Sequence, residues 1–163
     1  YEMMKAKGQD KLIEQYKMTP FTVTVLSKLR TFCEKIMSLV RFSRTKNPIS
    51  DLKNKVRHIY DIHQMLKNEE INHFFESSDF DEMLVKVGRD DILSYKNNNK
   101  WVFEHPSTAL IFDKPQEVWE QLSTEYNGNF KDLVTGDLPL EKDIVKALNI
   151  VSKRLKEINW KVK

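Results

Sequence analysis

Glycine and proline are scarce in this chain, and their scarcity constrains the fold more than any other feature. Only four glycines and five prolines interrupt 163 residues. A sheet of many strands needs frequent turns, which these residues supply, whereas helices need long stretches without them. The remaining composition, 40% hydrophobic and 31% charged, is typical of a globular chain that forms a core. We therefore predict a mainly α, multi-helix fold with at most one or two short strands near the N-terminus.

The spacing of apolar residues predicts where the helices lie. Ser27 and Ser50 are suited to N-cap two successive helices, and Asp79 with Glu82 resembles a capping box. The period of a buried helical face predicts helices over residues 9–18, 28–42, 51–66, 69–75, 79–94, 115–126 and 140–158. The segment Phe21–Leu26 instead alternates apolar and threonine residues with a period of two, which predicts a short strand.

Basic residues are concentrated in one part of the chain. The net charge is only +3, yet residues 28–57 contain nine lysines and arginines against two acidic residues. A local excess of this kind favours a polyanion such as nucleotide phosphate or RNA. The alternative is a solvated helix face without a partner, which is the commonest role of such residues.

Two polar rows on successive predicted helices are the best candidates for chemistry. Thr31, Lys35 and Ser38 share one face of the first helix, and His58 and Asp61 share one face of the second. The connection is short, so the helices should pack antiparallel and bring Lys35 and Asp61 together. The alternative is a solvated lysine beside an Arg57–Asp61 surface pair of little energetic weight.

Other residue types argue against a metal site, a disulfide framework or a membrane protein. The four histidines lack the spacing of zinc ligands, so we predict no metal site in this chain. The single cysteine, Cys33, lies on a predicted buried stripe and fits a reducing compartment. No apolar run is long enough to span a membrane, and the first residues lack the features of a signal peptide. These features together predict a cytoplasmic protein, and the start at Tyr1 within a helix-like run suggests a truncated product.

Two motifs resemble those of the AbiEii/AbiGii nucleotidyltransferase toxins. The run Arg-Thr-Phe-Cys-Glu-Lys-Ile at residues 30–36 follows a Val-Thr-Val segment and is similar to that family's R-T-x-x-E-K-I helix. The run Lys-Val-Arg-His-Ile-Tyr-Asp-Ile at residues 55–62 is similar to its R-x-K/R-D-I/L-Y-D-I/L motif, although His58 stands where the family often has an acidic residue. Order and spacing also match. A weaker resemblance continues through residues 130–136 into the last predicted helix.

The resemblance implies a toxin of an abortive-infection toxin–antitoxin pair that transfers nucleotides from an NTP to RNA, with a tRNA acceptor end as the implied target. It further implies Mg²⁺ and NTP in the full-length protein, neither of which we expect this chain to hold alone, and a separately encoded antitoxin. Lys35 and Asp61 would be catalytic, with Lys35 on the nucleotide phosphates and Asp61 positioning that lysine or a substrate hydroxyl. Arg57, Arg30 and Thr31 would bind nucleotide phosphates. Residues 1–47 would be a remnant of the nucleotidyltransferase domain, and residues 48–163 a helical C-terminal domain.

One part of the family signature is missing from this sequence. The nucleotidyltransferase pattern of Gly-Ser followed by a carboxylate pair on a strand does not occur between residues 1 and 163. We therefore expect this chain alone to be inactive in nucleotidyl transfer. The rival hypotheses are a non-catalytic helical module that binds nucleic acid or a partner protein through residues 28–57, and a family member that has lost its activity.

Overall fold

The computed structural model describes residues 1–162 and is built from helices, with no strand among them. The mainly α prediction is confirmed. Ten α-helices follow one another along the described chain: α1 (Glu2–Ala6), α2 (Asp10–Gln15), α3 (Lys28–Phe42), α4 (Pro48–Lys53), α5 (Val56–Met65), α6 (Glu69–Glu76), α7 (Ser78–Ser94), α8 (Leu110–Asp113), α9 (Pro115–Glu125) and α10 (Glu141–Lys156). Short 3-10 and π turns connect α7 to α8 and α9 to α10.

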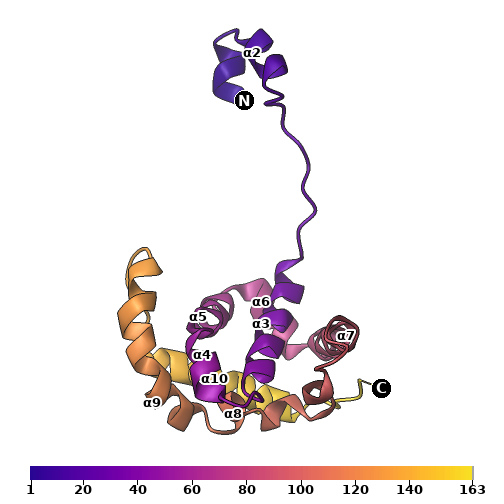
Figure 1. Ribbon diagram of the computed structural model, residues 1–163, viewed down its shortest axis with the longest axis vertical. Helices are drawn as coiled ribbons and strands as arrows, with labels where there is room; N and C mark the ends of the chain where they lie inside the picture. Colours follow the sequence, from indigo (N-terminus) through magenta and orange to yellow (C-terminus); the bar gives the residue numbers. More distant parts are fainter. Residues whose placement is uncertain (163) are drawn as a thin grey trace.

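Helix α3 lies at the centre of the helical body (Figure 1). It begins as predicted, because the Ser27 side chain accepts a hydrogen bond from the Arg30 backbone N–H at 3.2 Å. Its apolar stripe, which includes Phe32, Cys33 and Ile36, is fully buried. Helices α5 and α7 both pack against α3, while α10 packs against α5, α8 and α9. The polar side of α3 is therefore left between α5 and α7.

The predicted helix over residues 51–66 is two helices. The chain leaves the helical path at Asn54 and Lys55, between α4 and α5. Pro48 occupies the first turn of α4, where its missing N–H costs nothing, so this helix begins three residues before the start expected at Asp51. The expected cap of α7 also moves, since Ser77 rather than Asp79 accepts the capping hydrogen bond.

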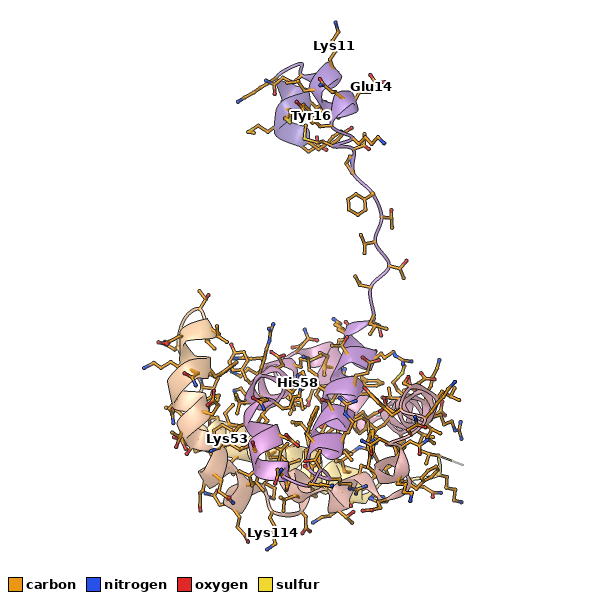
Figure 2. The ribbon with its side chains drawn as sticks, in the orientation of Figure 1. Lys11, Glu14, Tyr16, Lys53, His58 and Lys114 are labelled. Atoms are coloured by element: carbon orange, nitrogen blue, oxygen red, sulfur yellow. The ribbon has the colours of Figure 1, made fainter. Side chains whose placement is uncertain are left out.

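The strand predicted over Phe21–Leu26 does not form. This segment is extended and links α1 and α2 to the rest of the chain, and its side chains stand clear of the helical body (Figures 1 and 2). Phe21, Val23 and Val25 are 83%, 61% and 77% exposed. A strand needs a neighbour to pair its backbone groups, and the described chain provides none. The alternating pattern therefore gives an extended conformation without a sheet.

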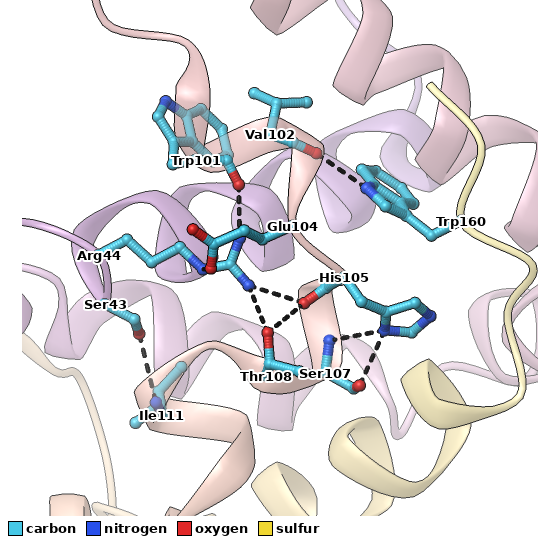
Figure 3. Close-up of polar contacts among 10 residues, drawn as sticks. All are labelled: Ser43, Arg44, Trp101, Val102, Glu104, His105, Ser107, Thr108, Ile111 and Trp160. Atoms are coloured by element: carbon cyan, nitrogen blue, oxygen red, sulfur yellow. Dashed lines mark hydrogen bonds and ion pairs between the residues drawn. The ribbon is translucent and has the colours of Figure 1, made fainter. Parts of the chain in front are cut away.

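A buried arginine joins the C-terminal half to the end of α3 (Figure 3). The Arg44 guanidinium donates to the backbone carbonyl oxygens of Trp101 and His105 and to Thr108 Oγ1 at 2.5 to 2.8 Å. Burial lowers its pKa, while Glu104 opposes that shift from 3.5 Å. Arg44 therefore has a structural role: it fixes the turn that carries Trp101 against α3.

None of the helices in the described part of the chain is both long and apolar enough to cross a membrane.

Candidate active site

A pocket of about 410 Å³ lies where α3 passes between α5 and α7. Its lining is mostly polar and comes from all three helices and from Trp101 in the turn after α7. Three predicted site residues of α3 line it: Arg30, Thr31 and Lys35. A concave surface with a few convergent polar groups is the usual form of a small-molecule site. The pocket therefore collects the sequence candidates of α3 in one place.

Lys35 and Asp61 meet as predicted. The Lys35 ammonium donates to Asp61 Oδ2 at 2.7 Å across the α3–α5 contact, and their side chains are 19% and 22% exposed. A charge-assisted hydrogen bond of this length is among the stronger side-chain interactions. It holds the lysine at the pocket wall rather than leaving it free in solvent.

The three predicted phosphate ligands differ in how available they are. Arg57 lies outside the pocket lining; its side chain is 77% exposed, and its Nε is 3.8 Å from Asp61 Oδ2. Arg30 lines the pocket, but it donates to Glu34 at 2.9 Å and to Asp90 at 2.7 Å. Hydrogen bonds to those two carboxylates raise its pKa. Thr31 also lines the pocket, with its hydroxyl donating to the Ser27 carbonyl oxygen at 3.0 Å.

His58 of α5, which is labelled in Figure 2, lines the same pocket as Lys35. Burial lowers its pKa to about 4, and the positive charges of Lys35 and Lys55 add to this effect. The imidazole is therefore neutral at pH 7. Its Nδ1 is buried and has no hydrogen-bond partner among the described residues. An unpaired buried nitrogen of this kind is uncommon in folded proteins.

Sequence reasoning missed the contribution of α7. Asp90, Asp91 and Tyr95 line the pocket opposite α3. Burial raises the pKa of Asp91 to about 6, with Arg41 opposing the shift. The adjacent acidic pair at the end of α7 was a visible signal, but nothing in its spacing indicated which helix it would face. Arg41 of α3 also lines the pocket, although sequence reasoning did not select it as a site residue.

The described residues contain no group of three or more histidine, cysteine, aspartate or glutamate side chains that could hold a metal ion. Three carboxylates line the pocket, and two of them, Glu34 and Asp90, form ion pairs with Arg30. The described residues therefore do not fit a Mg²⁺ ion at this pocket. Cys33 is buried in the core, and burial raises its pKa to about 12, so it is neither a ligand nor a nucleophile.

Comparison with known proteins gives one match. A family profile described as "Nucleotidyl transferase AbiEii toxin, Type IV TA system" matches residues 8–154. The matched range covers both sequence motifs and the three helices that surround the pocket. No curated protein and no solved structure matches the chain.

Proposed function

This chain belongs to the AbiEii family of nucleotidyl transferase toxins of type IV toxin–antitoxin systems, and we propose that α3, α5 and α7 form the nucleotide-binding side of its active site. The reaction we propose is transfer of a nucleotide from an NTP to RNA, with tRNA as the acceptor and with a separately encoded antitoxin as partner. The observation that carries this proposal is the ion pair that joins the two sequence motifs: Lys35 lines the pocket, and Asp61, outside the pocket lining, holds it at 2.7 Å.

Lys35 would bind the NTP phosphates. Nucleotidyl transfer depends mainly on cations that orient the triphosphate and offset the charge that develops on it. The ammonium has three donors, of which Asp61 takes one at 2.7 Å, so others remain for phosphate oxygens. The carboxylate fixes the direction of the lysine side chain. Asp61 is thus a positioning residue for Lys35.

Arg30, Thr31 and Arg57 would have smaller roles. Arg30 would reach phosphate only by exchanging a carboxylate partner, because both of its present partners are acidic. Arg57 is exposed beside Asp61 and would meet the RNA rather than the NTP. Divalent metal use is suggested by the family, but the described residues do not fit Mg²⁺, so the roles proposed here involve only the chain's own side chains.

We also propose the division of the chain at residue 47, with residues 1–47 belonging to the nucleotidyltransferase domain. In this division α3 would belong to that domain while it packs against α5 and α7 of the helical domain. The pocket would then lie at the junction of the two.

The rival function is a non-catalytic module that binds nucleic acid through the basic residues of 28–57. Five of those nine cations lie within 4 Å of a carboxylate: Lys28, Arg30, Lys35, Arg44 and Arg57. Pairing of this kind reduces the field that a polyanion would meet. The ion pairs therefore favour a defined nucleotide-binding pocket over a continuous basic surface that binds nucleic acid.

The test is NTP binding by the 163-residue chain. Lys35→Ala should weaken ATP binding at least about tenfold, since a charge-assisted contact is lost. Lys53→Ala removes the same charge from the exposed end of α4, outside the pocket, and should leave ATP binding within about twofold. Thermal melts of both variants separate lost contacts from lost folding. Equal, small effects of both variants on ATP, with weaker RNA binding in each, would support the rival instead.

A further inference from the structure

Arg41 differs from the other cations of the pocket in its partners. Arg30 and Lys35 each donate to a carboxylate, whereas the Arg41 side chain makes no hydrogen bond or ion pair with any described residue. Its guanidinium nevertheless lines the pocket near the last turn of α3. Asp91 is the acidic group that interacts with it electrostatically, without a hydrogen bond. Arg41 is thus the cation of this pocket whose donors are unused within the described chain.

Two aromatic rings hold this guanidinium in position. Its Cζ lies 4.7 Å from the centroid of the Phe42 ring and 4.2 Å from that of Tyr95 on α7. Both distances lie well within the range of a cation–π contact. Such contacts engage the flat face of the guanidinium and leave the N–H groups at its edge free to donate. The rings therefore reduce the rotamer freedom of the arginine without occupying its hydrogen-bond donors.

A second cation, Lys55, lies against the same phenylalanine ring as Arg41. Lys55 places its ammonium 4.4 Å from the centroid of the Phe42 ring, and it has no carboxylate within 4 Å among the described residues. Arg41 and Lys55 therefore both lie against the Phe42 ring, and neither has a carboxylate within 4 Å among the described residues. Asp91 offsets part of the charge of Arg41, and a bound anion would offset more of the positive charge.

We propose that Arg41 is a phosphate-binding residue of this pocket, preorganised by the rings of Phe42 and Tyr95, and that its ligand is a phosphate group of a nucleotide. The planar fork of an arginine suits two phosphate oxygens, and fixing it beforehand lowers the entropy lost on binding. This inference rests on the proposed nucleotide site and adds Arg41 to it. The phosphate can come from the NTP or from the RNA backbone.

The test measures binding of tripolyphosphate, ATP and a short single-stranded RNA to the 163-residue chain. Arg41→Gln should weaken at least one of these ligands about tenfold or more, the loss expected for a charged hydrogen-bonding group. Arg41→Lys should not restore binding, because a lysine lacks the planar fork. Tyr95→Leu keeps an apolar side chain but removes the ring, and should weaken the same ligand several-fold. Lys46→Gln is the matched control, since Lys46 is an exposed lysine of the same basic stretch outside the pocket lining.

The three ligands distinguish the source of the phosphate. Weaker binding of tripolyphosphate and ATP assigns Arg41 to the NTP, and weaker binding of RNA alone assigns it to the acceptor backbone. If Lys35→Ala weakens ATP binding but Arg41→Gln weakens the binding of none of the three ligands, the proposed role of Arg41 is overturned while the proposed function stands. If Lys46→Gln matches Arg41→Gln, the effect is general charge and the inference is wrong. If the unaltered chain binds none of the ligands, both proposals fail.

Discussion

The Lys35 ammonium of α3 and the Asp61 carboxylate of α5 are 26 residues apart in sequence and 2.7 Å apart in space. Both side chains are about one-fifth exposed, so the pair is neither a solvated surface contact nor a fully buried one. Such an environment strengthens the attraction relative to water and leaves the lysine open to a ligand on its pocket side. Substitution of one residue of this pair should therefore change activity without unfolding the protein.

In a form of the protein that carries out nucleotidyl transfer, Lys35→Ala should lower the single-turnover rate by about 10² to 10³, which is typical for loss of one electrostatic contact to a transferring group. The fold should survive, since the removed side chain lies at the pocket wall. Lys53→Ala should keep the rate and reduce only the salt-sensitive affinity for RNA by roughly one phosphate contact. Rates and melting temperatures of both variants check this, and a rate lost together with the melting transition would indicate unfolding instead.

The 163-residue chain should show no nucleotidyl transfer to RNA with any NTP and Mg²⁺, because its sequence lacks the carboxylate pair of the family signature. Incorporation of labelled NTP into RNA is the measurement, with a protein-free reaction as the control. Incorporation above that control would mean that other carboxylates of this chain, Glu34, Asp90 and Asp91 first among them, serve the reaction.

Gly88→Ala should destabilise the helical body. A Cβ at this position in α7 would lie 2.7 Å from Cη2 of Trp160 and 3.0 Å from Cγ1 of Val162. Both are buried or partly buried, so the indole must shift and strain its 2.8 Å hydrogen bond to the Val102 carbonyl oxygen. Overpacking of this kind costs about 1 to 3 kcal/mol. Chemical denaturation gives the free energy of unfolding. Val85→Ala, on the same helix and only partly buried, is a control that creates space instead of a clash.

The sequence predicts the helices well where the signal is local. The Ser27 cap, the buried stripe of α3 and the apolar stripe of α5 each depend on neighbouring residues and were confirmed. The break at Asn54 and Lys55 was missed because the apolar period continues across it. The prediction of a strand at residues 21–26 was wrong. An alternating pattern indicates only that a segment could fit a sheet, whereas a strand forms only when another strand pairs with it.

The candidate site was predicted only where a single turn of helix determines the direction of a side chain. Lys35 and Asp61 lie on α3 and α5, which only the short helix α4 separates in sequence, so their positions on the helix faces were enough to predict that they meet. Asp91 of α7 and its C-cap Tyr95 lie 49 and 53 residues after the end of α3 at Phe42. Their position in the pocket depends on long-range packing that no local pattern encodes. The sequence shows that Arg41 is a polar residue of α3, but it does not show that the rings of Phe42 and Tyr95 hold its guanidinium in place.

His58→Asn should reduce the loss of stability in acid. The folded-state pKa of His58 is about 4, below its ordinary value of 6.5, because burial and the charges of Lys35 and Lys55 disfavour the imidazolium. The folded protein thus binds fewer protons than the unfolded chain between these values. Stability is fully present above pH 6.5 and falls as pH decreases toward 4. The contribution is on the order of 1 kcal/mol after discounting for partial exposure. Urea unfolding at pH 7.5 and 4.5 should show a smaller difference in the variant than in the unaltered chain.

Asp91→Asn should have the opposite dependence on pH. Burial raises the folded-state pKa of Asp91 from 3.8 to about 6; Arg41 and Arg30 lower it, while Glu34 and Asp90 raise it further. The folded protein therefore binds more protons than the unfolded chain between pH 4 and 6, so stability falls as pH rises through 6.

The substitution removes a half-buried charge at pH 8 and a neutral acid at pH 4. We expect it to stabilise the chain by on the order of 1 kcal/mol at pH 8, discounted for the partly solvated carboxyl, and to change little at pH 4. It should also tighten ATP binding at pH 8, because the negative charge nearest Arg41 is lost. Asp113→Asn, which alters an exposed carboxylate on α8, provides the control. Equal stabilisation by Asp91→Asn at both pH values would mean that the pKa of this carboxyl does not differ between the folded and the unfolded chain. Unchanged ATP affinity would mean that Asp91 does not compete with the phosphate for Arg41.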